Sequence, residues 1–436
     1  MSGRNKYIYK ITYNKEIASN LVRISKSIDY ASIFISNKDN YSNLPPQYIK
    51  YDIIAGIDKL EVLKPNNNSF NALKKFHKKY TDWMFGYLSY DLKNEIENLQ
   101  TTKHDEINSR KLYFFIPKYV LLLKGTSLTV LTFVSKKKTD LFIQSILKDN
   151  KAEIENFNIN LYQRESKKDY INKIHAIKER IQMGDIYEMN YCLNFYCNNI
   201  SINSQELFLK LNRNTKTPFA SFFRLNECNI ICASPERFIK KNKNTIISQP
   251  IKGTIRRGGD IVEDKKLINI LQNSEKDITE NIMIVDLVRN DLSKYAIAAS
   301  VYVEELCKVY TFDKIHQMIS TISAKIPDKV HFTEILKSTF PMGSMTGAPK
   351  LSAMQLIDKF EESQRGIFSG SLGYITPSGD FDFNVVIRTI LYNSETKYIS
   401  SSVGGAITAN SEPEKEYEEC LVKINPILNS LQNGSV

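Results

Sequence analysis

Short apolar segments, interspersed irregularly with helical stretches, limit most strongly what this chain can fold into. Such segments lie at 229–233, 370–375 and 382–390. Each is predicted to be a strand, because its apolar residues are continuous or alternate over a length too short for a typical helix. The sequence contains no regular strand-helix-strand repeat, no Gly-x-Gly-x-x-Gly opening and no Walker phosphate loop. We therefore expect an α+β fold with antiparallel sheets.

Three longer stretches are predicted to be helices. Residues 165–183 carry apolar side chains at helical spacing, and Gly184 follows as a stop signal. Residues 278–292 are hydrophobic over most of the helix circumference, which indicates burial. The last helix is predicted to begin at Ser411, with Glu414 completing a capping box.

The charge and composition favour an ordinary globular protein. The formal net charge is +11, but the basic residues are scattered and the short run at 136–138 has no interleaved aromatic residues for base stacking. A basic nucleic-acid-binding or scaffold protein is therefore only the non-enzymatic alternative. No run of 18 apolar residues and no apolar leader occurs, and no two of the six cysteines form a Cys-x-x-Cys pair. We expect a cytoplasmic protein with reduced thiols and no membrane or nucleic-acid partner.

The predicted buried helix carries acids that need partners. Glu280, Asp286 and Asp291 lie on it, and an unpaired buried carboxylate is costly. Carboxylates from this helix and from the last one would suit Mg²⁺, a hard ion that takes oxygen ligands. The alternative is a salt bridge with Arg289.

Two charged residues follow apolar strands, where scaffolds display chemistry. Glu236 lies in Ser234-Pro-Glu-Arg, and Lys252 lies between Pro250 and Gly253. A neutral lysine amine can be a nucleophile, and a sheltered glutamate can be a general acid. Either residue could instead be a surface charge.

Two glycine-containing segments could bind anions. Thr346 lies in Gly343-Ser-Met-Thr-Gly-Ala-Pro-Lys350, just before a predicted helix. Gly404 and Gly405 would leave backbone N–H groups open to a carboxylate, although glycine pairs are as often simple turns.

Together these segments resemble the chorismate-utilising enzymes, a family that includes component I of anthranilate synthase and of aminodeoxychorismate synthase, and the isochorismate and salicylate synthases. The resemblance is dense from about 184 to 430. The matching motifs are Gly184-Asp-Ile-Tyr-Glu-Met-Asn, Ser234-Pro-Glu-Arg, Pro250-Ile-Lys-Gly-Thr, Glu280 through Asp291, His316-Gln-Met-Ile-Ser, Gly343 through Lys350, Gly373-Tyr, Ile387-Arg-Thr, Gly404-Gly405 and Glu416-Tyr-Glu-Glu-Cys-Leu-Val-Lys423.

Within the family, Lys252 is the discriminating residue. Pro250-Ile-Lys-Gly-Thr resembles the aminodeoxychorismate synthases of folate synthesis, whereas anthranilate synthases usually have Ala at this place. The resemblance implies that Lys252 attacks C2 of chorismate while Glu236 protonates the C4 hydroxyl, and that ammonia then opens the covalent intermediate at C4. Anthranilate synthase component I is the nearest alternative, and an isochorismate or salicylate synthase is a more distant one.

The resemblance also implies the rest of the site. Glu280 and Glu419 would hold Mg²⁺, with Glu416 nearby, and the metal would bind the ring carboxylate. Tyr374 and Arg388 would hold the enolpyruvyl carboxylate. The implied substrate-binding residues are Thr254, His316, Thr346, Tyr374, Arg388, Gly404, Gly405 and Lys423.

The family fold implied is antiparallel sheets sandwiching helices, with 1–160 as an N-terminal part of few chemical motifs and 161–436 as the chorismate-binding catalytic region. No cysteine lies in a glutaminase-like Gly-x-Cys-x-Gly elbow, so ammonia is expected from a separate glutamine amidotransferase subunit. Two residues depart from the family pattern. Glu188 replaces its usual Gln, and Ala406 replaces a third Gly.

Overall fold

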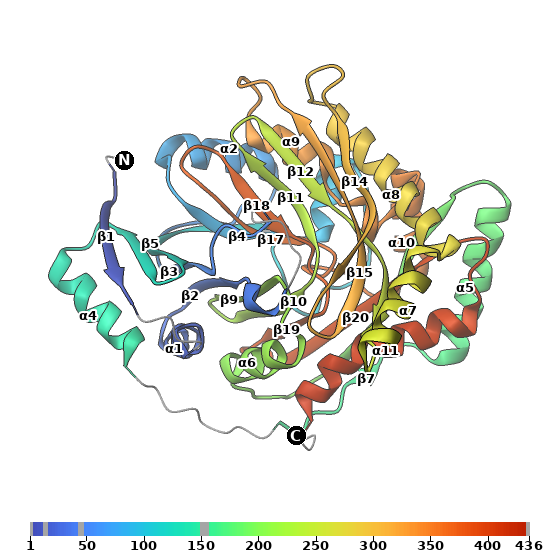
Figure 1. Ribbon diagram of the computed structural model, residues 1–436, viewed down its shortest axis with the longest axis horizontal. Coiled ribbons are helices and arrows are strands. Elements are labelled where there is room, and N and C mark those ends of the chain that lie inside the picture. The colour runs from blue at the N-terminus through green and yellow to red at the C-terminus, as the bar shows by residue number, and fades with distance from the viewer. Residues whose placement is uncertain (1–2, 12–15, 42–47, 149–156, 433–436) are drawn as a thin grey trace.

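The strands form an antiparallel network that branches at β5 (Leu112–Lys124) in the computed structural model (Figure 1). The structure describes residues 3–11, 16–41, 48–148 and 157–432. One half of β5 pairs with β4 (Met84–Leu88) and the other half with β6 (Ser127–Thr132), while β3 (Ile53–Leu63) runs along both halves. Two sheets therefore diverge from one long strand.

The first sheet links strands from both ends of the chain. Its order is β1 (Asn5–Lys10), β6, β5, β3, β2 (Tyr30–Ile35), β9 (Phe219–Leu225), β10 (Cys228–Ser234), β19 (Thr389–Asn393), β20 (Tyr398–Ile407), β8 (Glu188–Cys197) and β7 (Tyr162–Gln163). The short β16 (Gly347–Ala348) pairs with the beginning of β8.

The second sheet runs from β5 and β4 in the other direction. Its order is β4, β17 (Ser371–Ile375), β18 (Phe381–Asn384), β11 (Arg237–Asn242), β12 (Thr245–Gln249) and β15 (Ile315–Lys325). β13 (Ile251–Arg256) continues along the same edge of β15 as β12, and β14 (Tyr302–Thr311) takes the other edge. Since β2 and β4 pair with strands from beyond residue 160, both sheets mix the two predicted parts. The division at 160 stays a prediction.

Helices pack in two rows. Helices α4 (Lys136–Leu147), α1 (Glu16–Ile24), α6 (Ser204–Thr215), α11 (Pro413–Leu431) and α5 (Lys167–Gln182) contact one another in succession and share a hydrophobic core with the first sheet (Figure 1). Helices α2 (Ser69–Tyr80), α9 (Phe332–Thr339) and α8 (Glu275–Ser293) share the second core with both sheets. The remaining α-helices of the described residues are α3 (Lys93–Ile96), α7 (Ile261–Gln272) and α10 (Lys350–Phe360). The predicted α+β fold is confirmed.

The predicted helix at 165–183 is confirmed, because α5 covers 167–182 and the Ser166 hydroxyl accepts a hydrogen bond from the Asp169 N–H. The predicted capping box at Ser411 is wrong. The Ser411 hydroxyl instead donates to Glu416 at 2.8 Å and accepts from the Thr408 N–H, and α11 begins at Pro413.

The predicted single strand at 382–390 is also wrong. β18 ends at Asn384 and β19 begins at Thr389, because Arg388 between them has a φ of 52° that no strand accommodates. The break places Arg388 at the junction of the two sheets, since β18 belongs to the second and β19 to the first.

Arg237 joins three strands of the second sheet, and its side chain is 2% exposed. Its guanidinium donates to Asp382 on β18 at 2.9 Å and to the Gln249 side chain on β12. Replacing it with Met would leave Asp382 without its cation in a low-dielectric interior.

We expect Arg237→Met to lower the free energy of unfolding by about 3 to 5 kcal/mol, because it removes one partner of a buried ion pair. Urea denaturation measures this change. The matched control is Arg256→Met, which breaks an exposed pair with Glu263 and should cost at most about 1 kcal/mol. Equal losses in both variants would contradict the role given to Arg237.

Candidate active site

Lys252 on β13 lies between two buried carboxylates. Its Nζ is 3.9 Å from Oε1 of Glu188 on β8 and 3.8 Å from Oε2 of Glu280 on α8, and its side chain is 11% exposed. Three elements distant in sequence therefore meet at one amine. The alternative that Lys252 is a surface charge does not hold.

Opposing effects act on the Lys252 amine. Burial lowers its pKa, but the carboxylates of Glu188, Glu280, Glu236 and Glu419 together raise the pKa above the ordinary lysine value. In the ligand-free protein Lys252 is therefore an ammonium ion that neutralises part of a dense negative cluster.

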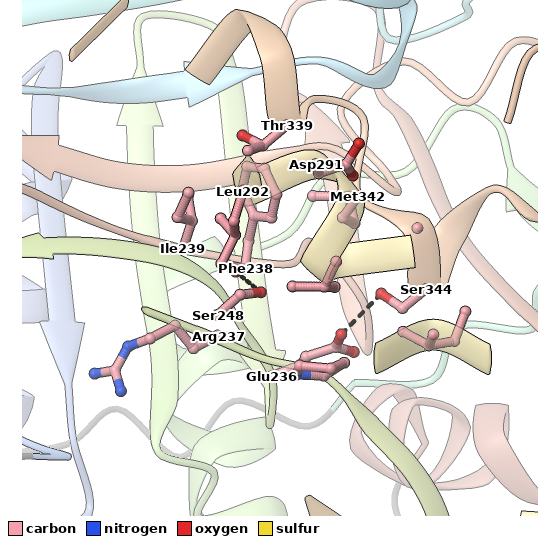
Figure 2. A pocket seen from close by; sticks show the side chains of 14 residues that line it. Glu236, Arg237, Phe238, Ile239, Ser248, Asp291, Leu292, Thr339, Met342 and Ser344 are labelled. Atoms are coloured by element: carbon pink, nitrogen blue, oxygen red, sulfur yellow. Dashed lines mark hydrogen bonds between the residues drawn. The ribbon is translucent and has the colours of Figure 1, made fainter. Parts of the chain in front are cut away.

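Glu236, in the turn after β10, is 5% exposed and points toward Ser344 in Figure 2. The Ser344 hydroxyl donates to its Oε1 at 2.8 Å. Burial raises the pKa of Glu236 to about 7, although this hydrogen bond and the Lys252 ammonium oppose the shift. At neutral pH much of Glu236 thus keeps its proton, as a general acid requires.

Glu236 and Ser344 also line a pocket that reaches Asp291 at the end of α8 (Figure 2). Asp291 pairs there with Lys350 and with Lys294. Asp286 lies on the exposed side of α8 and pairs with Arg289 at 2.7 Å, as the salt-bridge alternative predicted. Of the three acids noted on this helix, only Glu280 faces Lys252.

Helix α11 presents Glu416 and Glu419 to the β20 glycines. A Cβ on Gly405 would lie 3.2 Å from Oε2 of Glu416 and 3.9 Å from Oε1 of Glu419, so the backbone approaches these acids closely. Lys423 pairs with Glu419 at 2.6 Å and donates to the Gly404 carbonyl at 2.8 Å. Burial raises the pKa of Glu419, but Lys423 outweighs it and holds the pKa below its usual value.

Lys276 lies between the acid on α8 and those on α11. Its Nζ lies 3.3 Å from Oε1 of Glu416 and 4.0 Å from Oε1 of Glu280. Burial raises the pKa of Glu280, while Lys252 and Lys276 oppose this shift. No sequence motif singled out Lys276, because its contacts with both acids form only when α8 and α11 meet.

The donors around Lys276 match a hard divalent cation in chemistry. Within the described residues, Glu188 Oε2 and Glu280 Oε1 are buried without hydrogen bonds. Four carboxylates (Glu188, Glu280, Glu416 and Glu419) and the partly protonated Glu236 share the cluster with three lysines (252, 276 and 423), which leaves an excess of negative charge. Oxygen donors with unmatched charge are what Mg²⁺ takes. No three acidic, thiol or imidazole groups in the described ranges already converge as a metal site.

Arg388 lies on the wall of a second pocket, together with Gln317 and Pro235. Burial lowers the pKa of Arg388, and Glu419 opposes the shift. Gln317 is 2% exposed and its Oε1 has no hydrogen bond among the described residues. Sequence reasoning did not single out Gln317, which lies within the His316 motif. Thr254 on β13 is exposed, and its hydroxyl lies 3.5 Å from the Gln317 amide.

Three predicted substrate contacts have other neighbours. His316 is fully buried, with Nδ1 at 2.9 Å from the Thr311 hydroxyl and Nε2 at 2.9 Å from Asp264. Tyr374 packs against Phe34, Trp83 and Phe85, and it lines a different pocket with Arg237.

The hydroxyl of Thr346 is also engaged within the protein, because it donates to the Met342 carbonyl at 3.1 Å. The structure brings together Lys252, Glu236, Glu280, Glu416, Glu419, Gly404, Gly405 and Lys423. It does not bring His316, Thr346 or Tyr374 into contact with this cluster among the described residues. Their substrate roles stay predictions.

The chain is similar to proteins of a known family. A family model described as chorismate binding enzyme matches residues 30–429. Aminodeoxychorismate synthase component 1 of Escherichia coli is 40% identical over 267 residues, which are 61% of this chain and 58% of that protein. The chain thus spans about three-fifths of that relative. An anthranilate synthase component I-like protein of Synechocystis is 31% identical over 381 residues, covering 86% of this chain and 78% of its own.

Solved structures support the fold. Anthranilate synthase component I from Streptococcus pneumoniae superimposes with a TM-score of 0.71 at 19% identity, covering 97% of this chain and 92% of that one. The menaquinone-specific isochorismate synthase from Escherichia coli gives a TM-score of 0.75 at 14% identity, covering 99% and 95%. No helix in the described part of the chain is long and apolar enough to cross a membrane.

The raised pKa of Glu236 predicts a pH-dependent stability. The folded protein favours the protonated form, so this stabilisation is complete below the ordinary glutamate pKa and is lost as pH rises through about 7. Glu236→Gln has no such titration. Between pH 5.5 and 8.5, the free energy of unfolding should therefore shift in favour of the variant by about 2 kcal/mol. Urea denaturation at several pH values measures it, and parallel pH curves would contradict the assignment.

Proposed function

The chain belongs to the chorismate-binding enzyme family, and from this premise we propose that it converts chorismate and ammonia to 4-amino-4-deoxychorismate. The observation that carries the proposal is the buried Lys252 amine within one cluster with Glu236 and Glu280. Relatives named aminodeoxychorismate synthase, from bacteria and plants, support this choice within the family.

In the proposed reaction, Lys252 is the nucleophile and Glu236 is the general acid. The Lys252 amine, once its proton has left, attacks C2 of the ring, the two conjugated ring double bonds shift, and the C4–oxygen bond breaks. Glu236 gives its proton to the departing hydroxyl, which leaves as water. Ammonia then attacks C4, the two double bonds shift back, and the bond between C2 and the Lys252 nitrogen breaks. The proton that the added ammonia loses restores the Glu236 carboxyl group. The Ser344 hydroxyl hydrogen-bonds the Glu236 carboxylate and so stabilises it after it has lost the proton.

Glu280, Glu416 and Glu419 would hold Mg²⁺ through their carboxylate oxygens. When bound, the ion supplies positive charge for the ring carboxylate of the substrate. Around it, Gly405 leaves room beside the acids because it has no Cβ, and Lys423 pairs with Glu419 and donates to the Gly404 carbonyl.

Cationic and polar groups at the edge of the cluster would orient the substrate. Arg388 offers a planar guanidinium fork suited to a carboxylate, and Lys423 adds a second positive charge. Thr254, His316, Thr346 and Tyr374 are the remaining proposed contacts, although the last three have protein partners in the ligand-free state.

Ammonia is proposed to come from a separate glutamine amidotransferase subunit. Several relatives are named component 1, which describes one part of a larger assembly. Free ammonium should replace that partner in vitro. The proposed setting is cytoplasmic folate synthesis.

Product identification tests the function. We expect the purified protein, given chorismate, Mg²⁺ and ammonium, to form 4-amino-4-deoxychorismate, measured by chromatography and mass spectrometry. Anthranilate would instead favour the alternative suggested by the Synechocystis relative. Isochorismate or salicylate would assign the chain to the more distant branches.

Lys252→Ala should reduce formation of the 4-amino product by at least about 1000-fold, because the nucleophile is lost. The matched control is Lys308→Ala, which removes an exposed lysine on β14 and should leave the rate unchanged. Retained activity in Lys252→Ala, with circular dichroism matching the wild type, would remove Lys252 from the nucleophilic role.

A further inference from the structure

Glu188 is a buried carboxylate to which the proposed chemistry gives no task. It is 2% exposed, and its Oε2 has no hydrogen bond within the described residues. Within the described ranges its one ion pair is with Lys252, through Oε1 at 3.9 Å. A buried carboxylate with a free oxygen is costly, so its retention calls for a specific partner.

The backbone holds Glu188 rigidly in place. Glu188 begins β8, where it pairs with Ala348 of β16, and the neighbouring Tyr187 N–H donates to the Ala348 carbonyl at 2.7 Å. Gly347 has a φ of +148°, and a Cβ there would lie 2.2 Å from the Glu188 carbonyl oxygen. Only glycine allows this close approach, so the position of the Glu188 backbone is set by a steric constraint.

Lys252 is shared almost equally between Glu188 and Glu280, at 3.9 and 3.8 Å. The two acids differ in their other neighbours. Glu280 also faces Lys276 and belongs to the group of acids proposed to hold the cation, whereas Glu188 lies on another element and faces Lys252. A cation that engages Glu280 would leave Glu188 as the carboxylate that keeps Lys252 in place.

We propose that Glu188 is the positioning residue for Lys252, a carboxylate on a rigid strand that holds the amine in the site while Glu280 serves the cation. This inference rests on the proposed function for its catalytic consequence. The Gln that the family pattern has at this place could accept a hydrogen bond from Lys252 but could not balance its charge. Glu188 is therefore a distinct solution for orienting the same amine.

A double-mutant cycle on the metal-free protein tests the contact without any turnover. Lys252→Met leaves Glu188 and Glu280 buried without their shared cation, and we expect it to lower Tm by about 4 to 8 °C. Adding Glu188→Gln to Lys252→Met should restore about half of this loss, because one unpaired charge is removed. Additive Tm changes in the double variant would overturn the proposal.

Kinetics with free ammonium test the catalytic consequence. Glu188→Gln should lower kcat about 100-fold through misplacement of the amine, while the KM values for Mg²⁺ and chorismate change less than about twofold. Glu188→Asp keeps the charge and should recover part of kcat. Glu280→Gln should instead raise the KM for Mg²⁺. The matched control, Glu418→Gln, alters an exposed acid on α11 and should change neither constant.

Two results would overturn the positioning role. One is an unchanged kcat in Glu188→Gln, and the other is a rise in the KM for Mg²⁺ equal to that of Glu280→Gln, which would make Glu188 a metal ligand. A wild-type protein that forms no 4-amino product would reject the proposed function instead. In that case the Tm cycle still decides whether Glu188 holds Lys252.

Discussion

The Lys252 ammonium among buried carboxylates is the interaction on which the rest of the site depends. Glu188, Glu280, Glu236 and Glu419 all raise its pKa, and each comes from a different part of the chain. Without that cation the acids would repel one another in a low-dielectric interior, and without the acids the amine would be a costly buried charge. The cluster therefore ties β8, β13, α8 and α11 together through electrostatics.

Lys252 and Glu236 lie close together, yet their surroundings drive them toward opposite charge states. Burial dominates at Glu236 and favours its neutral form, whereas neighbouring carboxylates dominate at Lys252 and favour its charged form. Burial disfavours the charged form of both groups, but it prevails only at Glu236, because four carboxylates outweigh it at Lys252.

Carboxylates outnumber ammonium groups in the site, so an additional positive charge would be stabilised there. Lys276 neutralises part of the negative charge between Glu416 and Glu280, and Lys423 neutralises another part at Glu419. Oε2 of Glu188 and Oε1 of Glu280 still have no hydrogen bond within the described residues. A site in which carboxylates outnumber ammonium groups favours binding of a cation together with an anionic substrate, because the charge of each compensates that of the other.

By itself the sequence determined the α+β class and the helix at 165–183, and it predicted Glu236 and Lys252 as site residues, because apolar periodicity and strand-end placement are local properties. Tertiary structure decided the rest. The extended segment is interrupted at Arg388, where the chain passes from one sheet to the other. The Ser411 hydroxyl donates to Glu416 instead of capping a helix. The ion pairs of Glu188 and Lys276 form only when elements distant in sequence meet. Ion pairing depends on distances in space, which residue order does not specify.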